Sequence, residues 1–133
     1  MSHYSTIETE FRDEDVLVET LEEMEPNWVV ERHSTPTNLF GYENDMRPEK
    51  AHLIIRRNYV GTASNDIGFV REGNTYRAII SEYDQGQHGA EWLGKLTQNY
   101  AANKVMKSMR VHGWRLGSRT TTEKGSIKMV LEV

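Results

Sequence analysis

NYVGTASNDIGFVREGNTYRAIISEYDQ, residues 58–85, is the stretch whose pattern decides the fold of this chain. It contains two runs rich in β-branched and aromatic residues, at 66–71 and 75–83, and such runs are typical of strands. Between them lies Gly73-Asn74, a pair that tolerates positive φ angles and therefore indicates a tight hairpin. A similar run at 51–57 precedes them, so we expect the centre of the fold to be a β-sheet.

The segments outside this stretch add two helices and more strands. Asp13 is a favourable N-cap, and the apolar residues after it predict an amphipathic helix from 14 to about 24. A longer helix is expected over 89–110, whereas the prolines and asparagines of 34–50 favour an irregular loop. Further strands are expected at 3–11, at 27–33 and on both sides of a turn at 123–125. The sequence therefore predicts an α+β fold in a single domain, residues 1–133, with an antiparallel-rich sheet of about six or seven strands and two helices packed on one face.

Composition narrows the class of protein. The chain has 133 residues, of which 37% are hydrophobic and 27% charged, as in soluble globular domains. It has no cysteine, which excludes disulfides, thiolate nucleophiles and cysteine-ligated metal sites. No apolar run approaches the roughly 18 residues of a membrane span, and the N-terminal residues lack a secretory pattern. We expect a cytoplasmic protein, or one of a plastid stroma, that does not bind a membrane.

Charge is distributed unevenly along the chain. Residues 1–50 carry thirteen acids and four bases, whereas residues 51–133 carry seven acids and twelve bases. Three interpretations stay open: the two parts neutralise each other across the fold, they support head-to-tail association, or the second part offers a basic face to nucleic acid.

The loop after Asn58 is the first candidate site. A phosphate-binding loop needs several glycines, usually a lysine, and a helix behind it. This loop has one glycine, no lysine and a strand behind it, so a hairpin connection is the favoured interpretation. If the chain binds a small ligand, the candidate residues are His52, Arg56, Arg57, Thr62, Ser64, Asn65 and Asp66.

Catalytic and metal-binding patterns are weaker still. The acids Glu82, Asp84 and Glu91 favour a solvated turn that initiates a helix over an acid–base pair. The five histidines lack the spacing of helical metal ligands, and no nucleophile elbow is present. The sequence therefore predicts no catalytic residue, no metal and no cofactor.

The long helix offers two alternative surfaces. Basic residues interleaved with aromatic ones, as in nucleic-acid sites, are Lys95, Lys104, Lys107, Arg110 and Arg115. A second apolar face, with Val105, Met106 and Met109, indicates contact with something other than the sheet, such as a partner subunit.

Several strings together resemble one family: MSHYSTIETEFRDEDVLVETLEEM, AHLIIRRNYVGTASNDIGF, YRAIISEYD and LTQNYAANKVM. They are similar to the domain of unknown function 1257, also called hypothetical chloroplast reading frame 35, of cyanobacteria, red-lineage plastids and phages. The similarity covers nearly the whole chain, with looser matches at 25–50 and in the tail RLGSRTTTEKGSIKMVLEV. The resemblance implies a small, soluble accessory protein of a cell, plastid or phage, in the last case in the host cytoplasm. It supplies no catalytic residues.

The leading expectation is a non-catalytic binding or assembly module that acts through self-association or a protein partner. The first alternative is a small-ligand or nucleotide-binding protein, and the second is a nucleic-acid-binding protein. An enzyme ranks last, because no motif supports one.

Overall fold

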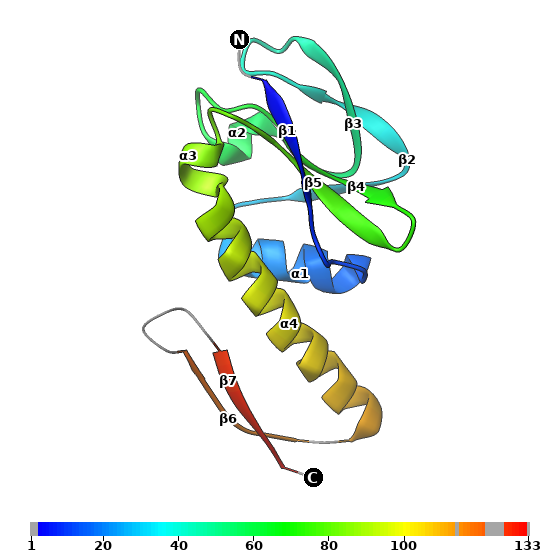
Figure 1. The fold of residues 1–133 in the computed structure, drawn as a ribbon, viewed down its shortest axis with the longest axis vertical. Coiled ribbons are helices and arrows are strands. Elements are labelled where there is room, and N and C mark those ends of the chain that lie inside the picture. Colours follow the sequence, from blue (N-terminus) through cyan, green and yellow to red (C-terminus); the bar gives the residue numbers. More distant parts are fainter. Residues whose placement is uncertain (1–2, 114, 122–126, 133) are drawn as a thin grey trace.

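A computed structural model of the chain describes residues 3–113, 115–121 and 127–132 (Figure 1). The elements follow one another in the order β1 (Tyr4–Glu8), α1 (Glu14–Met24), β2 (Val30–Phe40), β3 (Met46–Ile55), α2 (Arg57–Val60), β4 (Ile67–Glu72), β5 (Thr75–Ser81), α3 (Gln85–His88), α4 (Ala90–His112), β6 (Arg115–Thr121) and β7 (Ile127–Glu132). The α2 and α3 elements are single helical turns.

The main sheet has five strands in the order β1-β5-β4-β3-β2, and all neighbours are antiparallel. The predicted hairpin between β4 and β5 is confirmed, and Gly73 takes a φ angle of 62° in its turn. The α+β class is therefore confirmed, but the predicted strand count of the sheet was wrong. The β6 and β7 strands pair only with each other, because α4 carries the chain away from the edges of the main sheet. Their predicted turn at 123–125 lies outside the described residues.

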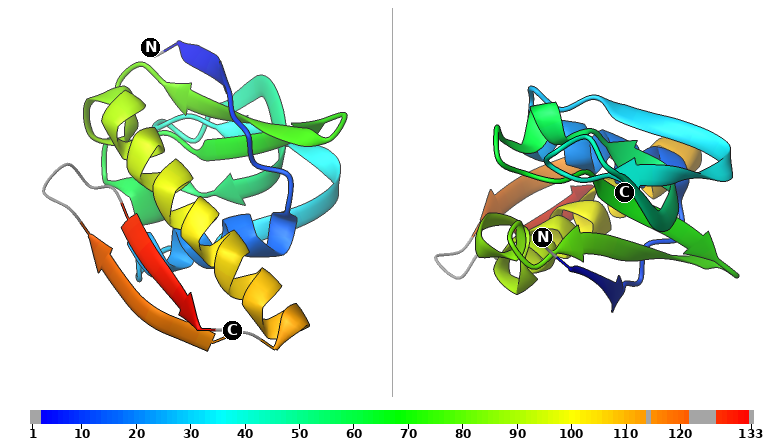
Figure 2. Two further views of the ribbon diagram at one scale, coloured as in Figure 1. Left: turned by 60° about the horizontal axis from the view of Figure 1, so that its bottom comes forward. Right: turned by 90° about the horizontal axis from the view of Figure 1, so that it is seen from above.

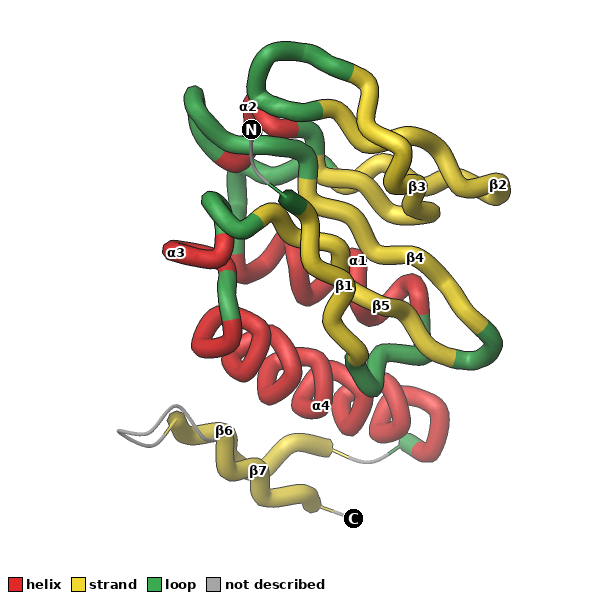
Figure 3. The backbone as a smooth tube through the Cα atoms, turned by 45° about the horizontal axis from the view of Figure 1, so that its top comes forward, coloured by secondary structure: helices red, strands yellow, loops and turns green. Residues whose placement is uncertain are grey.

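Both long helices cover the same face of the main sheet, as predicted (Figure 3). The α1 helix begins at its expected N-cap, Asp13, whose carboxylate accepts a hydrogen bond from the backbone N–H of Val16 at 3.1 Å. The core between helices and sheet combines residues of both layers: Leu17 and Leu21 from α1, Leu93 and Leu96 from α4, and Leu53, Ile55, Ile67, Phe69 and Ile80 from the sheet. This burial is the main force that holds the helices on the sheet.

The segment 34–50, predicted to be an irregular loop, is mostly strand. It continues β2 to Phe40 and starts β3 at Met46, and only the short turn between them is irregular. Proline is tolerated here because residues 46–50 of β3 pair with β2 alone, and β3 meets β4 only from Leu53 onwards. This extension curls over the second face of the sheet, where Leu39 packs in a small apolar cluster with Ala51, Ile54 and Ile79.

The β6–β7 hairpin lies along α4, on the side of the helix away from the main sheet (Figures 1 and 2). This arrangement gives the second apolar face of α4 a neighbour within the same chain. Of the residues predicted to meet a partner, Met109 is buried, Met106 is half-buried and Val105 is exposed. In the described part of the chain, no helix is both long and apolar enough to cross a membrane.

Acids from the first part of the sequence pair with bases from the second. Asp13 accepts hydrogen bonds from Lys107 at 2.5 Å and Lys104 at 3.4 Å. Other such pairs join Glu31 to Arg56 at 2.9 Å and Glu8 to Arg77 at 3.4 Å. The uneven charge along the chain is therefore partly neutralised within the fold, which is the first of the three interpretations.

The ion pairs of Asp13 with Lys104 and Lys107 make the free energy of unfolding depend on pH in the acidic range. Burial by itself would raise the pKa of this carboxyl, but hydrogen bonds from Lys107, the Val16 backbone and Lys104 outweigh it and lower the pKa from 3.8 to about 2. Because the folded-state pKa lies below the unfolded one, the stabilisation is complete above about pH 4 and disappears as the pH falls towards 2. Both lysines are partly exposed, so solvent reduces the effect.

We expect Asp13→Asn, which keeps a good N-cap, to weaken this acid sensitivity. Between pH 5 and pH 3, the wild-type chain should lose about 0.5–1 kcal/mol more of its free energy of unfolding than the variant does. Urea denaturation at both pH values measures the difference. Asp15→Asn, at an exposed position of the same helix, is the matched control. Equal losses in wild type and Asp13→Asn would show that the lysine pairs contribute nothing.

Candidate ligand-binding site

The loop between α2 and β4 is anchored by the buried side chains of two consecutive residues, Asn65 and Asp66. Asp66, 1% exposed, accepts hydrogen bonds from the backbone N–H groups of Arg57 at 2.7 Å and Phe40 at 2.8 Å. Its carboxylate also pairs with the guanidinium of Arg56 at 2.9 Å. These bonds join the loop to the ends of β2 and β3, so Asp66 holds three segments of the chain together.

A first hollow, which we call the Arg56 hollow, lies on one side of this anchor. It is lined by Phe40, Asn44, Arg56, Arg57, Asn58 and Asp66 and has a volume of about 470 Å³. Its cations already have partners. Arg56 forms two hydrogen bonds with Glu31, at 2.9 and 3.0 Å, and these bonds lower the pKa of Glu31. Arg57 donates to the Asn44 side chain at 3.1 Å. The positively charged groups of this hollow are therefore already paired with other groups of the protein, which makes them less available to an anion.

A buried polar network lies on the other side of the anchor. Asp84, 3% exposed, uses Oδ2 to accept hydrogen bonds from the Asn65 backbone N–H at 2.9 Å and the Ser81 hydroxyl at 2.8 Å. The Asn65 amide donates to the Ser81 hydroxyl at 2.9 Å. The interpretation of Asp84 as a solvated acid was wrong, because the loop folds over it. Glu82, its neighbour in sequence, is exposed as expected.

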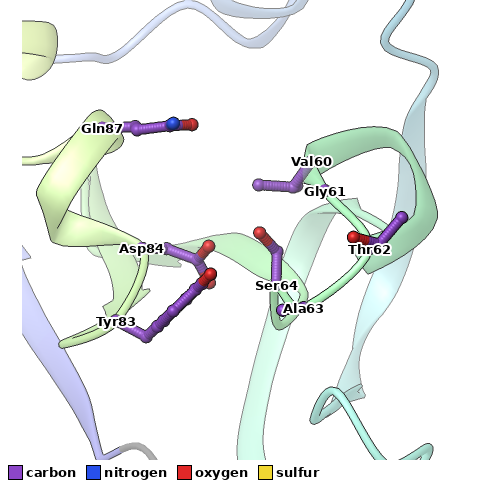
Figure 4. Close-up of a pocket in the computed structure, with 8 residues that line it drawn as sticks. All are labelled: Val60, Gly61, Thr62, Ala63, Ser64, Tyr83, Asp84 and Gln87. Carbon is purple, nitrogen blue, oxygen red and sulfur yellow. The ribbon is translucent and has the colours of Figure 1, made fainter.

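This network forms one wall of a second hollow, which we call the Ser64 hollow. It has a volume of about 380 Å³, within the range of small-molecule sites, and is lined by Val60, Gly61, Thr62, Ala63, Ser64, Tyr83, Asp84 and Gln87. Figure 4 shows the side chains of Ser64, Val60 and Gln87 pointing into the space between the loop and α3. Two elements far apart in sequence therefore build the site.

Several polar groups of the Ser64 hollow lack a partner within the described part of the chain. The Ser64 side chain is 7% exposed, yet its hydroxyl makes no hydrogen bond to any described residue. The same holds for Asp84 Oδ1, whereas Oδ2 is held by Asn65 and Ser81. Both residues line the hollow, so the hydroxyl and the free carboxylate oxygen are available there to a hydrogen-bonding ligand.

Gly61 keeps the hollow open. A Cβ atom at this position would lie 2.8 Å from the Ser64 hydroxyl oxygen, closer than real Cβ contacts come. Its φ angle of 170° is ordinary extended backbone, so the requirement for glycine is one of space and not of conformation. A larger residue would push Ser64 away from its place in the wall.

The structure divides the residues predicted to bind a small ligand into three groups. Arg56, Arg57 and Asp66 line the Arg56 hollow, Thr62 and Ser64 line the Ser64 hollow, and Asn65 lies in the network between them. His52 lies apart, farther along β3, where its Nδ1 accepts a hydrogen bond from the Arg71 backbone at 3.0 Å. Sequence reasoning missed Tyr83 and Gln87, because nothing local indicates that α3 faces the loop.

The predicted nucleic-acid surface is only partly available. Lys104 and Lys107 are paired with Asp13, and Lys95 lies 3.8 Å from Glu91. Arg110 lies in the last turn of α4 and is exposed. The side chain of Arg115 lies outside the described residues. Among the described residues, no three histidine, aspartate or glutamate side chains lie together in a way that could hold a metal ion.

The fold and the site together define an α+β protein with a ligand-sized polar hollow beside its sheet. The family model for "Protein of unknown function (DUF1257)" matches residues 20–130. The chain is also 31% identical, over 134 residues, to the "Uncharacterized protein ycf35" of Guillardia theta; the match covers 99% of this chain and 97% of that protein. The chain belongs to the DUF1257 family, as its sequence strings indicated. No solved structure matches it.

Proposed function

We propose that this protein is a binding module that holds a small polar ligand in the Ser64 hollow. The observation that carries the proposal is the pair of unpartnered polar groups, the Ser64 hydroxyl and Asp84 Oδ1, beside a hollow of about 380 Å³. An ionised carboxylate only accepts hydrogen bonds, so the ligand must present a donor to Asp84. No lysine or arginine lines the hollow, which disfavours a nucleotide or another anion.

The protein also holds the binding group Asp84 in position before a ligand binds. Ser81 and Asn65 hold Asp84 Oδ2 in place, so the remaining oxygen keeps its direction without the ligand. Preorganisation of this kind lowers the entropy lost on binding. The Arg56 hollow is larger, but its charged groups pair with each other and offer less to a ligand.

Assembly through α4 and binding of nucleic acid stay predictions with less support. The β6–β7 hairpin already lies along α4, and Asp13 pairs with two of the basic residues. We propose a cytoplasmic or stromal location for the binding module, in keeping with a curated relative whose name is that of a ycf35 protein.

A titration followed by NMR tests the proposed function. The ¹⁵N-labelled chain is titrated with small polyols, primary amines, amides and dicarboxylates. We expect at least one class of hydrogen-bond donor to give saturable shifts of the amide signals of Ser64, Asn65 and Gln87, and we expect dicarboxylates to give none. Ser64→Ala should weaken that binding by about tenfold, because it removes one hydrogen bond to the ligand.

The matched control is Ser34→Ala, at an exposed position of β2 away from the hollow. It should bind like the wild-type chain. The proposal is wrong if no compound shifts these signals, or if both serine variants bind as tightly as the wild type.

A further inference from the structure

A third hollow adjoins the Ser64 hollow and shares two of its residues, Val60 and Gln87. We call it the Trp28 hollow. Its volume is about 350 Å³, and its lining comprises Glu25, Pro26, Asn27, Trp28, Tyr59, Val60, Gln87 and His88. The two hollows are therefore neighbours on either side of these shared side chains, so a ligand that passes Val60 and Gln87 would extend from one hollow into the other.

The two hollows carry the same sign of charge. Asp84 lines the Ser64 hollow and Glu25 lines the Trp28 hollow, and neither lining includes a lysine or an arginine. The Glu25 side chain is 33% exposed, and its carboxylate lies 3.7 Å from Nε2 of His88, an imidazole that carries a charge only when it is protonated. Two carboxylates without a lysine or an arginine beside them favour a cation and repel an anion.

Two aromatic side chains, Trp28 and Tyr59, line the Trp28 hollow together with Glu25. The Trp28 ring lies 5.2 Å from the His88 ring, which in turn lies 5.1 Å from Trp92. The Tyr59 ring is 39% exposed at the edge of the hollow. Aromatic faces beside a carboxylate attract ammonium groups and accept the aliphatic chain attached to them.

We propose that the ligand is a linear organic cation with two ammonium groups, one bound at Asp84 and the other at Glu25. Its aliphatic chain passes Val60, the apolar side chain that both hollows share. This inference rests on the proposed function and names the chemical class of its ligand. The arrangement discriminates against monoamines, which reach one carboxylate, and against neutral polyols, which carry no charge.

Calorimetry with two defined probes, 1,4-diaminobutane and spermidine, tests the inference. We expect saturable binding of at least one of them, at least tenfold tighter than that of n-butylamine, and weaker binding as the salt concentration rises. Glu25→Gln should reduce the affinity at least tenfold and leave n-butylamine binding at Asp84 unchanged. This variant keeps the size of the side chain and the backbone hydrogen bonds of Glu25, and it replaces the carboxylate that lies 3.7 Å from His88.

Glu19→Gln, at an exposed position of α1, the helix that ends just before Glu25, is the matched control and should bind like the wild type. If Glu19→Gln weakens binding as much as Glu25→Gln does, the amines are attracted to the acidic chain in general and the inference is overturned. If a neutral polyol shifts the Ser64 signals and the diamines do not, the inference fails while the proposed function stands. If no compound binds, both fail.

Discussion

Asp66→Ala is expected to lower the free energy of unfolding by about 3–5 kcal/mol, the range for removing one member of a buried ion pair. The carboxylate is 1% exposed and accepts hydrogen bonds from two backbone N–H groups as well as from Arg56. Its removal takes this acceptor away from the two backbone N–H groups, whereas Arg56 keeps its bonds to Glu31. Burial, together with the charge of Asp66, also raises the pKa of Tyr4, whose hydroxyl donates to the Asp66 carbonyl at 2.8 Å.

A second substitution separates charge from volume at this position. Asp66→Asn keeps the size and one acceptor oxygen, so we expect a smaller loss, about 2–3 kcal/mol. Asp15→Ala is the control: this aspartate also pairs with an arginine, Arg32, but its side chain is 76% exposed. It should cost no more than about 1 kcal/mol. Urea denaturation of the three variants provides the comparison, and similar losses for Asp66→Ala and Asp15→Ala would contradict the anchoring role.

Phe69→Ala is expected to cost about 3–5 kcal/mol, the usual result of truncating a buried aromatic side chain. Phe69 is fully buried at the centre of β4, opposite Leu53 of β3. Its ring lies 6.3 Å from that of Phe11, which precedes α1. The cavity would therefore open where the sheet meets the segment that leads into the first helix.

Two further substitutions provide a comparison: a milder one at Phe69 and one at an exposed position of α4. Phe69→Leu keeps most of the apolar volume and should cost less than about 1.5 kcal/mol, so it stays measurable even if Phe69→Ala unfolds the chain. Val111→Ala, on a side chain that is 75% exposed, should change stability by no more than about 0.5 kcal/mol. Thermal and urea denaturation measure all three. Equal effects of Phe69→Ala and Val111→Ala would show that Phe69 is not part of the core.

Local patterns predicted the elements whose causes are local. The α1 helix runs over the predicted range because an aspartate N-cap and an apolar face stand within one short segment. The β4–β5 hairpin formed as predicted because Gly73 supplies the positive φ angle in the turn itself. The segment 34–50 was misread because the effect of its prolines depends on which strands lie beside them.

The candidate site depended on contacts between distant parts of the chain. Thr62 and Ser64 were predicted as ligand-binding residues, and they do line the Ser64 hollow. Asp84 was taken for a solvated acid, because it lies 19 positions after Asn65 and no local pattern indicates the hydrogen bond between them. The partners of Arg56 and Asp66 were likewise invisible, and these partners make the Arg56 hollow the weaker site.

The sequence by itself determined the family, the α+β class, the first helix and the central hairpin. Each of these follows from residues that are adjacent or recur at a regular spacing. The tertiary structure alone decided which polar groups pair and which face a hollow unpaired. That outcome depends on how α3 meets the α2–β4 loop, an arrangement set by the packing of the sheet and not by any local pattern. The stretch at 58–85 contains the α2–β4 loop and Asp84, the residue that precedes α3, and only folding brings them together.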